Sequence, residues 1–184
     1  MRKKNILVLT GSARKGGNSD RLADAFIKGA NSVGHQVVKY NTASKNMKPC
    51  IDCKACFRND IPCLFDKDFN ELSTYLDTSD VIVFATPLYA YSFPAALKLA
   101  IDKFNTYLVG EKEINIKESI LLVTAGEDNK EVFAGIVSTY NSIVRIANWS
   151  NRGIITVNGL MDKKSILKTD ALKEAEKLGQ SIRR

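Results

Sequence analysis

Short apolar runs and longer amphipathic segments alternate along this chain. Five runs of branched or apolar residues predict β-strands, at Asn5–Thr10, Gln36–Tyr40, Val81–Thr86, Ile120–Thr124 and Gly153–Val157. Three of these runs are continuously apolar, which favours strands covered on both faces. Apolar residues recur at helical spacing in the segments between and after them, at Ser19–Ala30, Asp68–Leu76, Pro94–Leu108, Glu131–Ile146 and Thr169–Ile182.

This alternation predicts one α/β domain over residues 1–184. Strands joined by helices form a parallel sheet with right-handed crossovers and helices on both faces. Five strands suit the doubly wound order 2-1-3-4-5, which is a three-layer sandwich. In such sheets a ligand binds beyond the carboxyl ends of the strands, where the strand order reverses. We therefore expect the site in the loops that follow the first, third and fourth strands.

The loop after the first strand, Gly11–Ser19, has the composition of a phosphate-binding loop. Its glycines allow a tight turn that points N–H groups inward, and the helix that follows adds unpaired amides and a positive dipole end. Ser12 and Ser19 add hydroxyl groups, and Arg14 adds a positive charge. The loop therefore predicts a site for a monophosphate, with an ordinary glycine-rich turn as the alternative.

Two better-known phosphate motifs do not fit this loop. Gly17 and Asn18 stand where a triphosphate loop needs Lys followed by Ser or Thr. Ala13 stands where a dinucleotide fingerprint needs its second glycine, and no acidic residue closes the second strand. A nucleoside triphosphate site and a Rossmann NAD site are therefore disfavoured.

The loop after the third strand is an aromatic segment between two prolines. Pro87 ends the strand and Pro94 suits the first turn of a helix, while Tyr89, Tyr91 and Phe93 lie between them. A flat heteroaromatic ring could lie against such a segment. The alternative is that these aromatic residues pack onto a neighbouring helix or a second subunit.

The four cysteines lie together in the long irregular segment Asn41–Lys67. Their pattern is C-x2-C-x2-C-x6-C, from Cys50, Cys53, Cys56 and Cys63. Such crowding is not typical of a disulfide-stapled secreted domain and favours a reducing compartment. Three thiolates in seven residues suit a 4Fe–4S cluster, and zinc is a further alternative. We favour unliganded thiols over both and assign no metal ligand.

Charge and hydropathy limit the classes of partner. The net charge is +7, but the basic residues are scattered, which favours a solvated surface over a nucleic-acid site. A positive surface also attracts anionic ligands such as nucleotide cofactors. No stretch approaches the roughly 18–20 apolar residues of a membrane helix, so we expect a cytoplasmic protein without membrane contact.

Three further features have ordinary structural interpretations. We expect His35 to lie on the surface, because no partner is evident in the sequence. We expect Trp149 to pack internally. Lys98 and Asp102 are four residues apart on one predicted helix and should form a surface pair.

Three segments resemble the NADPH-dependent FMN reductases and related iron–sulfur flavoproteins of the flavodoxin-like group. They are GSARKGGNSDRL, PCIDCKACFRNDIPCLFDKDF and SDVIVFATPLYAYSFPAALKLAIDKF. The resemblance implies a flavodoxin-like fold with FMN bound non-covalently. It implies that the FMN phosphate is held by Ser12, Arg14, Asn18 and Ser19. It also implies that the isoalloxazine is lined by Pro87, Leu88, Tyr89 and Ala90, and by Gly126 of TAGED. Many relatives carry a large aromatic residue where this chain has Ala90.

The resemblance implies an NAD(P)H-dependent oxidoreductase in which an acceptor such as a quinone, nitro compound or free flavin takes electrons from bound FMN. The flavin ring itself performs this chemistry, so we name no catalytic residue. The alternative is an iron–sulfur flavoprotein that transfers electrons with a ferredoxin-like partner, and a third hypothesis is a module that binds no flavin. The family resemblance also implies a homodimer or homotetramer. The acceptor and the choice between NADH and NADPH stay open.

Overall fold

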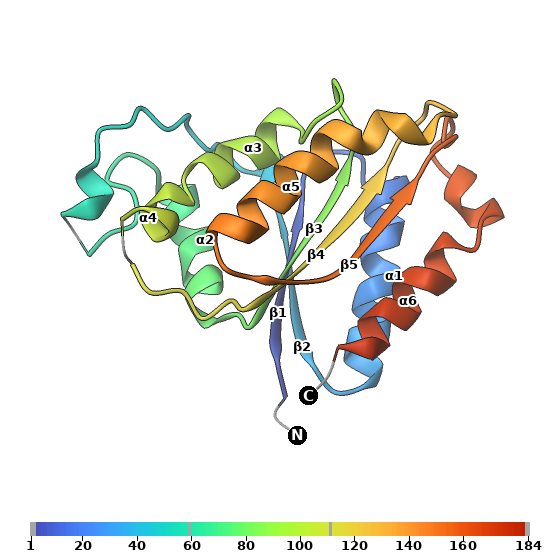
Figure 1. The fold of residues 1–184 in the computed structure, drawn as a ribbon, viewed down its shortest axis with the longest axis horizontal. Coiled ribbons are helices and arrows are strands. Elements are labelled where there is room, and N and C mark those ends of the chain that lie inside the picture. Colours follow the sequence, from blue (N-terminus) through green and yellow to red (C-terminus); the bar gives the residue numbers. More distant parts are fainter. Residues whose placement is uncertain (1–2, 59, 111, 183–184) are drawn as a thin grey trace.

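A computed structural model describes residues 3–58, 60–110 and 112–182. Its centre is a five-stranded parallel sheet of order β2-β1-β3-β4-β5 (Figure 1). The strands are β1 (Asn5–Thr10), β2 (Gln36–Asn41), β3 (Val81–Pro87), β4 (Glu118–Thr124) and β5 (Ser150–Val157). The predicted fold class and strand order are confirmed, and the strands differ from their predicted ranges only at their ends.

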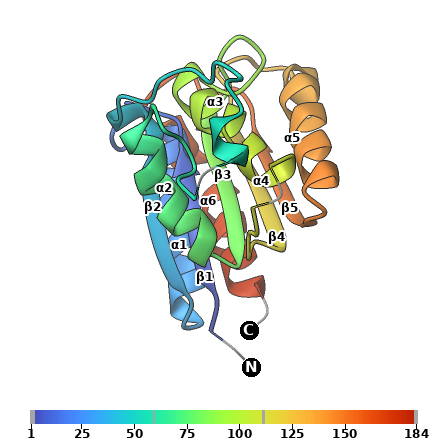
Figure 2. The ribbon, with the colours of Figure 1, turned by 90° about the vertical axis from the view of Figure 1, so that its left-hand side faces the viewer.

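Helices cover both faces of the sheet (Figures 1 and 2). One face carries α1 (Asn18–Ser32) and α6 (Ala171–Ser181). The other carries α2 (Lys67–Thr78), α3 (Ala95–Asp102), α4 (Asn105–Leu108) and α5 (Ala134–Ile146). Short 3-10 turns complete the described elements: η1 (Thr42–Ser44), η2 (Ala55–Phe57), η3 (Lys130–Phe133) and η4 (Ser165–Lys168).

Alternate residues of the strands build two separate cores. In β1, Leu7 and Leu9 face the helices α2, α3 and α5, whereas Ile6 and Val8 face α1 and α6. β3 and β4 contribute to both cores in the same way, and nearly all of their residues are buried. Continuous apolar runs therefore form strands covered on both faces, as the sequence predicts.

The helices α1 and α6 cross at backbone contact. A Cβ atom on Gly29 would lie 1.9 Å from the carbonyl oxygen of Glu176, and one on Gly179 would lie 2.3 Å from that of Phe26. No side chain fits at either position, so glycine is required on both helices. This close crossing seats α6 on α1 and leads the segment before α6 across the start of α1.

Two predicted helices differ from the structure. The segment Pro94–Leu108 forms two helices, because the amides of Lys103 and Phe104 donate to carbonyls three residues back rather than four. This break accompanies an inward turn of the Lys103 side chain. The segment Glu131–Ile146 begins as the 3-10 turn η3, where the side chain of Asn129 accepts a hydrogen bond from the Glu131 amide.

The prediction that His35 is a surface residue is wrong. His35 is 4% exposed, its Nδ1 accepts a hydrogen bond from the Lys4 amide at 3.2 Å, and its Nε2 lies 2.9 Å from the Ile182 carbonyl oxygen. Its partners are 31 and 147 residues away, which explains why local sequence did not show them.

The other two ordinary interpretations are confirmed. Trp149 is buried, and Lys98 pairs with Asp102 on α3. In the described ranges, no helix combines the length and apolar character needed to cross a membrane.

Candidate functional site

A cleft opens at the carboxyl edge of the sheet, beside the ends of β1, β3, β4 and β5. Its volume is about 180 Å³. Every residue predicted to contact FMN lines it except Ala90. The lining residues are Ser12, Arg14, Gly17, Asn18, Ser19, Pro87, Leu88, Tyr89, Thr124, Ala125, Gly126, Leu160, Met161, Asp162 and Lys163. The structure therefore brings together the loops after the first, third and fourth strands.

The start of α1 supplies hydrogen-bond donors at one end of the cleft. Gly17 caps the helix without a side-chain hydrogen bond, and the first amides of any helix have no partner within it. The Ser12 hydroxyl accepts from the Arg14 amide at 3.1 Å, which leaves its proton available for donation. The Ser19 side chain is buried beside it. These groups form an arrangement suited to an anion.

The acidic residue in the same helical turn is neutralised. Asp20 accepts a hydrogen bond from the Gly16 amide at 2.7 Å and pairs with Lys39 of β2. Burial raises the pKa of Asp20, but the hydrogen bonds from Lys39 and Gly16 outweigh that effect and hold the pKa below its ordinary value. The negative charge of Asp20 is thus balanced by Lys39, while Arg14 stays exposed at the cleft.

Gly11 allows the loop to follow β1 closely. A Cβ atom at this position would lie 2.9 Å from Cβ of Leu97 and 3.1 Å from Oγ1 of Thr86. Thr86 lies in β3 and Leu97 in α3, the two elements that the aromatic loop connects. The absence of a side chain at Gly11 therefore lets the phosphate-type loop and the aromatic loop approach each other.

The loop after β3 supplies an apolar wall. The Leu88 amide donates to the Thr124 carbonyl at 2.8 Å, which ties this loop to the end of β4. Tyr89 and Ser92 exchange two backbone hydrogen bonds, of 3.1 and 3.0 Å. Ala90 and Tyr91 form the tip between them, with positive φ angles of 46° and 61°. This turn places Ala90 on the exposed tip, outside the residues that line the cleft.

Sequence reasoning missed the segment after β5, which closes one side of the cleft with Leu160, Met161, Asp162 and Lys163. Because β5 neighbours β4 and both are parallel, their following loops lie at the same edge. The Asn158-Gly159 pair after the strand marks the turn and was an available signal.

The side chain of Asn18 holds this segment against α1. Its Nδ2 donates to the carbonyl oxygens of Asp162 at 2.8 Å and Leu160 at 3.3 Å, and its Oδ1 accepts from the Ile166 amide at 3.3 Å. The side chain is thus occupied by protein partners. Only the backbone amide of Asn18, in the first turn of α1, is left to meet an anion.

A second cavity, of about 340 Å³, lies among the cysteines. We call residues Lys48–Asp66 the cysteine loop. All four cysteines line the cavity, with Lys103, Asn105 and Thr106 on its other side. Cys50 and Cys53 are exposed, whereas Cys56 and Cys63 are half-buried. The two cavities have no lining residue in common.

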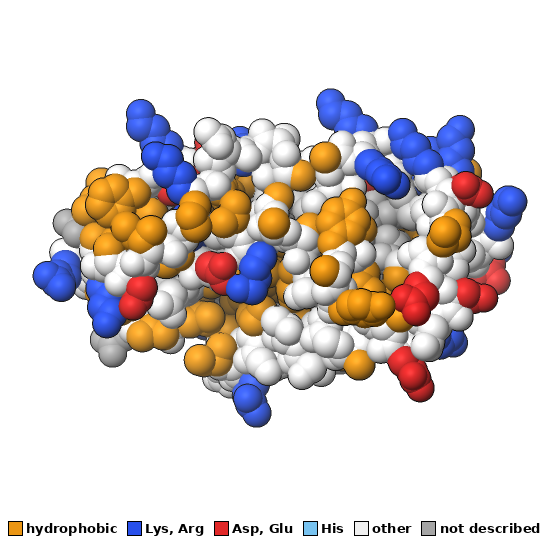
Figure 3. All heavy atoms as spheres, turned by 90° about the horizontal axis from the view of Figure 1, so that it is seen from above, with side chains coloured by type: hydrophobic (Ala, Val, Ile, Leu, Met, Phe, Trp, Pro, Cys, Tyr) orange, Lys and Arg blue, Asp and Glu red, His pale blue; other side chains and the backbone are white. Residues whose placement is uncertain are grey.

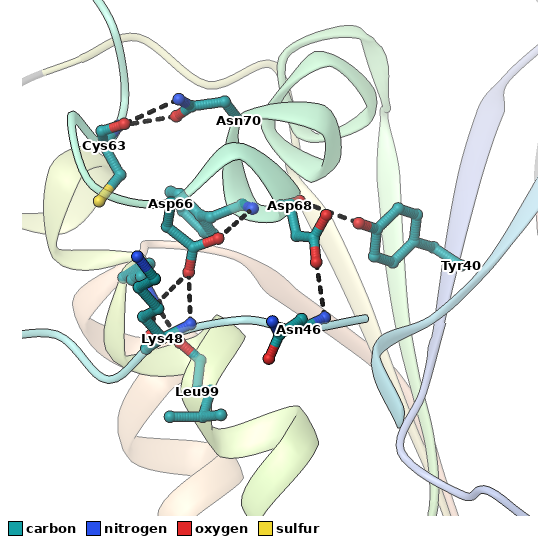
Figure 4. A network of polar contacts seen from close by, with 10 residues as sticks. Tyr40, Asn46, Lys48, Cys63, Asp66, Asp68, Asn70 and Leu99 are labelled. Carbon is teal, nitrogen blue, oxygen red and sulfur yellow. Dashed lines mark hydrogen bonds and ion pairs between the residues drawn. The ribbon is translucent and has the colours of Figure 1, made fainter. Parts of the chain in front are cut away.

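A buried ion pair anchors both ends of the cysteine loop (Figure 4). Lys103 Nζ lies 2.9 Å from Asp66 Oδ2, and the two side chains are 4% and 2% exposed. Asp66 also accepts hydrogen bonds from the amides of Lys48, at 2.8 Å, and Phe69, at 3.0 Å. Burial raises the pKa of Asp66, but the hydrogen bonds from Lys103 and these amides outweigh it and leave the pKa below its ordinary value.

Two hydrogen bonds position Cys63. Its amide donates to Oδ1 of Asn70 at 2.8 Å, and Nδ2 of Asn70 donates to the Cys63 carbonyl at 2.7 Å (Figure 4). Burial raises the pKa of Cys56 above its ordinary value, and the nearby Thr106 side chain offsets this only in part.

The thiols share one cavity but do not form a preformed metal site. Among the residues that the structure describes, no group of three or more His, Cys, Asp or Glu side chains stands close enough to hold a metal ion. The choice between a cluster, zinc and unliganded thiols therefore stays a prediction.

Residues 4–134, most of the chain, match the family model described as NADPH-dependent FMN reductase. The chain belongs to the NADPH-dependent FMN reductase family. The matched residues of this FMN reductase family member include the loop after β1, the cysteine loop and the aromatic loop. The segment after β5 lies beyond the matched residues.

Two curated relatives differ in how much of their length is shared. An iron–sulfur flavoprotein of Archaeoglobus fulgidus is 31% identical over 99 residues, which are 54% of this chain and 44% of that protein. The putative NAD(P)H-dependent FMN-containing oxidoreductase YwqN of Bacillus subtilis is 22% identical over 179 residues, which are 94% of this chain and 95% of that protein. This FMN reductase family member thus matches less than half of the first relative.

A solved structure confirms the fold over the whole chain. The NAD(P)H:quinone oxidoreductase from Methanothermobacter marburgensis is 18% identical, with a TM-score of 0.79, and the match covers 100% of this chain and 98% of that one. At this identity the likeness establishes the flavodoxin-like architecture of the family member.

The donor set of the cleft fits the cofactor that the family name implies. Backbone amides and hydroxyl groups line the cleft and are the donors that a phosphate needs. Pro87, Leu88 and Leu160 add apolar walls, as a flat heteroaromatic ring requires. The lining thus combines the polar and apolar groups that the two parts of FMN require.

Proposed function

We propose that this chain is an NAD(P)H-dependent FMN oxidoreductase that passes electrons to a small-molecule acceptor. The observation that carries the proposal is the shared cleft. A donor-lined start of α1 and an apolar loop after β3 line one cavity. Family membership supports the same assignment.

In this proposal the start of α1 binds the FMN phosphate. The amides of Asn18 and Ser19 point along the helix axis, and the helix dipole favours an anion there. The hydroxyl groups of Ser12 and Ser19 donate further hydrogen bonds, and Arg14 adds a charge-assisted contact from the rim. Lys39 keeps Asp20 from opposing the anion.

The loops after β3 and β4 orient the ring system. Pro87, Leu88 and Tyr89 present both backbone and apolar surface to the cleft, and Gly126 contributes backbone without a side chain. We retain Ala90 as a predicted ring contact through its place in the same turn. Bound FMN supplies the electron-transfer chemistry, so the side chains bind, orient and exclude water rather than act as acids or bases.

Charges at the cleft mouth favour a dinucleotide donor. Arg14 and Lys163 line the cleft and are exposed, while Asp162 beside them is the one described acidic residue in the lining. Figure 3 shows Lys and Arg side chains along the upper right of this face and Asp and Glu side chains below them. The positive charges of Arg14 and Lys163 at the cleft itself favour anionic NADH or NADPH.

Anaerobic reduction of the FMN-loaded protein tests the proposal. We expect the visible flavin band to bleach after NADPH or NADH is added, and to return when a quinone is added. Preparations of the full chain that bind FMN but stay unbleached with both nicotinamides would contradict the proposal. Preparations that bind no FMN would favour the module without flavin.

The cysteine cavity supports a second candidate, an iron–sulfur flavoprotein that exchanges electrons with a ferredoxin-like partner. All four thiols border one cavity, and cysteine thiolates are the ligands that iron–sulfur clusters use. Because the described thiols are not gathered into a ligand set, a cluster requires the cysteine loop to close further. Asp52 and Lys54 already hold left-handed backbone conformations in that loop.

Metal analysis separates the two candidates. The full chain is purified without oxygen, and iron and acid-labile sulfide are measured per protein. Comparable iron and sulfide that disappear together in the variant Cys53→Ser would support the cluster. Absence of both from the unaltered protein would remove this candidate, and zinc without sulfide would identify the remaining metal alternative.

We further propose that the protein is a cytoplasmic homodimer or homotetramer. Exposed apolar residues occur on the cysteine loop and at the aromatic turn, including Ile51, Phe65 and Tyr91 at 68%, 55% and 62% exposure. Figure 3 shows such side chains in a patch at the left-hand end of the face, over the cysteine loop. Light scattering of the FMN-loaded protein measures the assembly, and a monomer would contradict it.

A further inference from the structure

Met161 is an apolar side chain held in solvent at the mouth of the cleft. It is 80% exposed and lines the cavity. A Cβ atom on Gly126 would lie 3.2 Å from Met161 Sδ, so the thioether lies across the bare backbone at the end of β4. Sequence reasoning did not identify this residue, and it lies beyond the family match.

The backbone around Met161 is fixed on both sides. The Leu160 amide donates to the Ala125 carbonyl at 2.9 Å, and the Asp162 amide donates to the Ser165 hydroxyl at 3.0 Å. Asn18 holds the carbonyl groups of Leu160 and Asp162 from the other side. The exposure of Met161 therefore results from a defined backbone path.

Tyr89 faces the same cavity from the loop after β3. It is 49% exposed, and its paired hydrogen bonds with Ser92 fix its backbone. The tight turn that these bonds close holds two non-glycine residues at positive φ, an arrangement that the surroundings must enforce. Tyr89 and Met161 thus come from two separately anchored segments.

The chemistry of this pair favours a flat apolar ligand. An aromatic ring stacks on tyrosine, and a methionine sulfur contacts the edge or face of an aromatic ring favourably. The charged residues beside them, Asp162 and Lys163, have opposite signs. At this pair, the cleft mouth therefore selects ligands by flat shape and apolar surface rather than by charge.

We propose that Tyr89 and Met161 are specificity-determining residues that hold a flat, apolar aromatic acceptor of the quinone class at the cleft mouth. The inference rests on the proposed function. In the net reaction, NADPH, one proton and one quinone give NADP⁺ and one hydroquinone. The nicotinamide loses a hydride, the quinone gains two electrons and two protons, and bound FMN is unchanged overall.

The test compares two acceptors in the FMN-loaded full chain. Menadione represents the flat apolar class, and ferricyanide is a small hydrophilic acceptor. The measured quantity is the ratio of kcat/KM with menadione to kcat/KM with ferricyanide. For Met161→Ala we expect this ratio to fall about tenfold, because the variant loses one sulfur–aromatic contact and the apolar area that goes with it. We expect Met161→Leu to retain most of the ratio, because it keeps an apolar wall.

Leu167→Ala is the matched control. Leu167 is 52% exposed on the same segment and does not line the cleft, so its removal should leave the ratio unchanged. Flavin fluorescence and circular dichroism confirm that each variant binds FMN and is folded. Tyr89→Phe should keep the ratio and Tyr89→Leu should lower it, since stacking requires the ring.

The outcomes separate this inference from the function on which it rests. An unaltered protein whose flavin is not bleached by either nicotinamide overturns both. Normal bleaching with an unchanged ratio in Met161→Ala overturns the inference alone. A ratio in Met161→Leu as low as in Met161→Ala also overturns it, because an apolar wall would then not be the cause.

Discussion

The cleft at the carboxyl edge of the sheet and the cysteine cavity are both built at loops, but different interactions hold their walls in place. The walls of the cleft are strand ends and the first turn of α1, and the sheet fixes their positions. The cavity is enclosed by the cysteine loop, whose two ends meet at Asp66 and Lys103. One site is thus a consequence of topology, and the other depends on side-chain contacts, among them a buried charge pair.

This difference has energetic consequences. A polar group at a strand end keeps backbone partners even when one side chain is lost. The buried Asp66 carboxylate has no substitute, because it balances the Lys103 ammonium and also accepts hydrogen bonds from the Lys48 and Phe69 amides. Changes at the cleft should therefore alter binding, whereas changes at the pair should alter stability.

The substitution Asp66→Asn should have the largest effect. The amide retains a helix cap for α2 but leaves the Lys103 charge buried without a counter-ion. We expect the free energy of unfolding in urea to fall by about 3–5 kcal/mol. Adding Lys103→Met should recover a large part of the loss, because the uncompensated charge is removed.

Asp52→Asn provides the control within the same loop. Asp52 is exposed and has a positive φ of 50°, which asparagine tolerates well. Its effect should stay within about 0.5 kcal/mol. Equal losses in Asp52→Asn and Asp66→Asn would show that the buried pair does not hold the loop.

Acid should reproduce part of the same loss. The pKa of folded Asp66 is depressed, so its contribution to stability is complete above the unfolded pKa and is lost as the pH falls through the folded pKa. Urea unfolding measured from about pH 6 down to below pH 4 should show this loss. Asp66→Asn should show a smaller pH dependence than the unaltered protein, and equal slopes would contradict the assignment.

At the cleft, Arg14→Ala should weaken FMN binding without unfolding the protein. Loss of one charge-assisted contact to a phosphate corresponds to about a tenfold rise in Kd, measured by flavin fluorescence. Lys15→Ala is the matched control, because Lys15 is exposed next to Arg14 and does not line the cleft. The same Kd in both variants would exclude a specific role for Arg14.

The sequence predicted what periodicity and strand ends determine. β1 matches its predicted range, and the loops after β1, β3 and β4 meet in one cleft as the strand order requires. Long-range contacts were not predictable. The Lys103–Asp66 pair, the buried His35 and the contacts of Asn18 with the segment after β5 all join residues far apart in the chain.

Two features were misjudged because contacts far along the chain or the place of a strand in the sheet decide them. The helical spacing of Pro94–Leu108 continues through residue 103, and nothing in that pattern shows that Lys103 turns inward to Asp66, the residue that caps another helix. Met161 was missed because a single apolar residue in a polar loop has no periodicity. Its importance depends on which strand precedes it and where that strand lies in the sheet.

The smallest predicted effect is at the aromatic turn beside the cleft. Ala90 has a φ of 46°, a conformation that costs an alanine roughly 1–2 kcal/mol relative to glycine. Ala90→Gly removes this cost but adds freedom to the unfolded chain, worth about 0.4–1 kcal/mol. We therefore expect a net stabilisation of about 0.5–1 kcal/mol in urea unfolding. Ala95→Gly, at an exposed helical position of α3, should instead destabilise by up to about 1 kcal/mol. Of these two alanines, only Ala90 has a left-handed backbone conformation. Opposite signs of the change in unfolding free energy in the two variants would show that the surroundings enforce this turn. Equal signs would show that they do not.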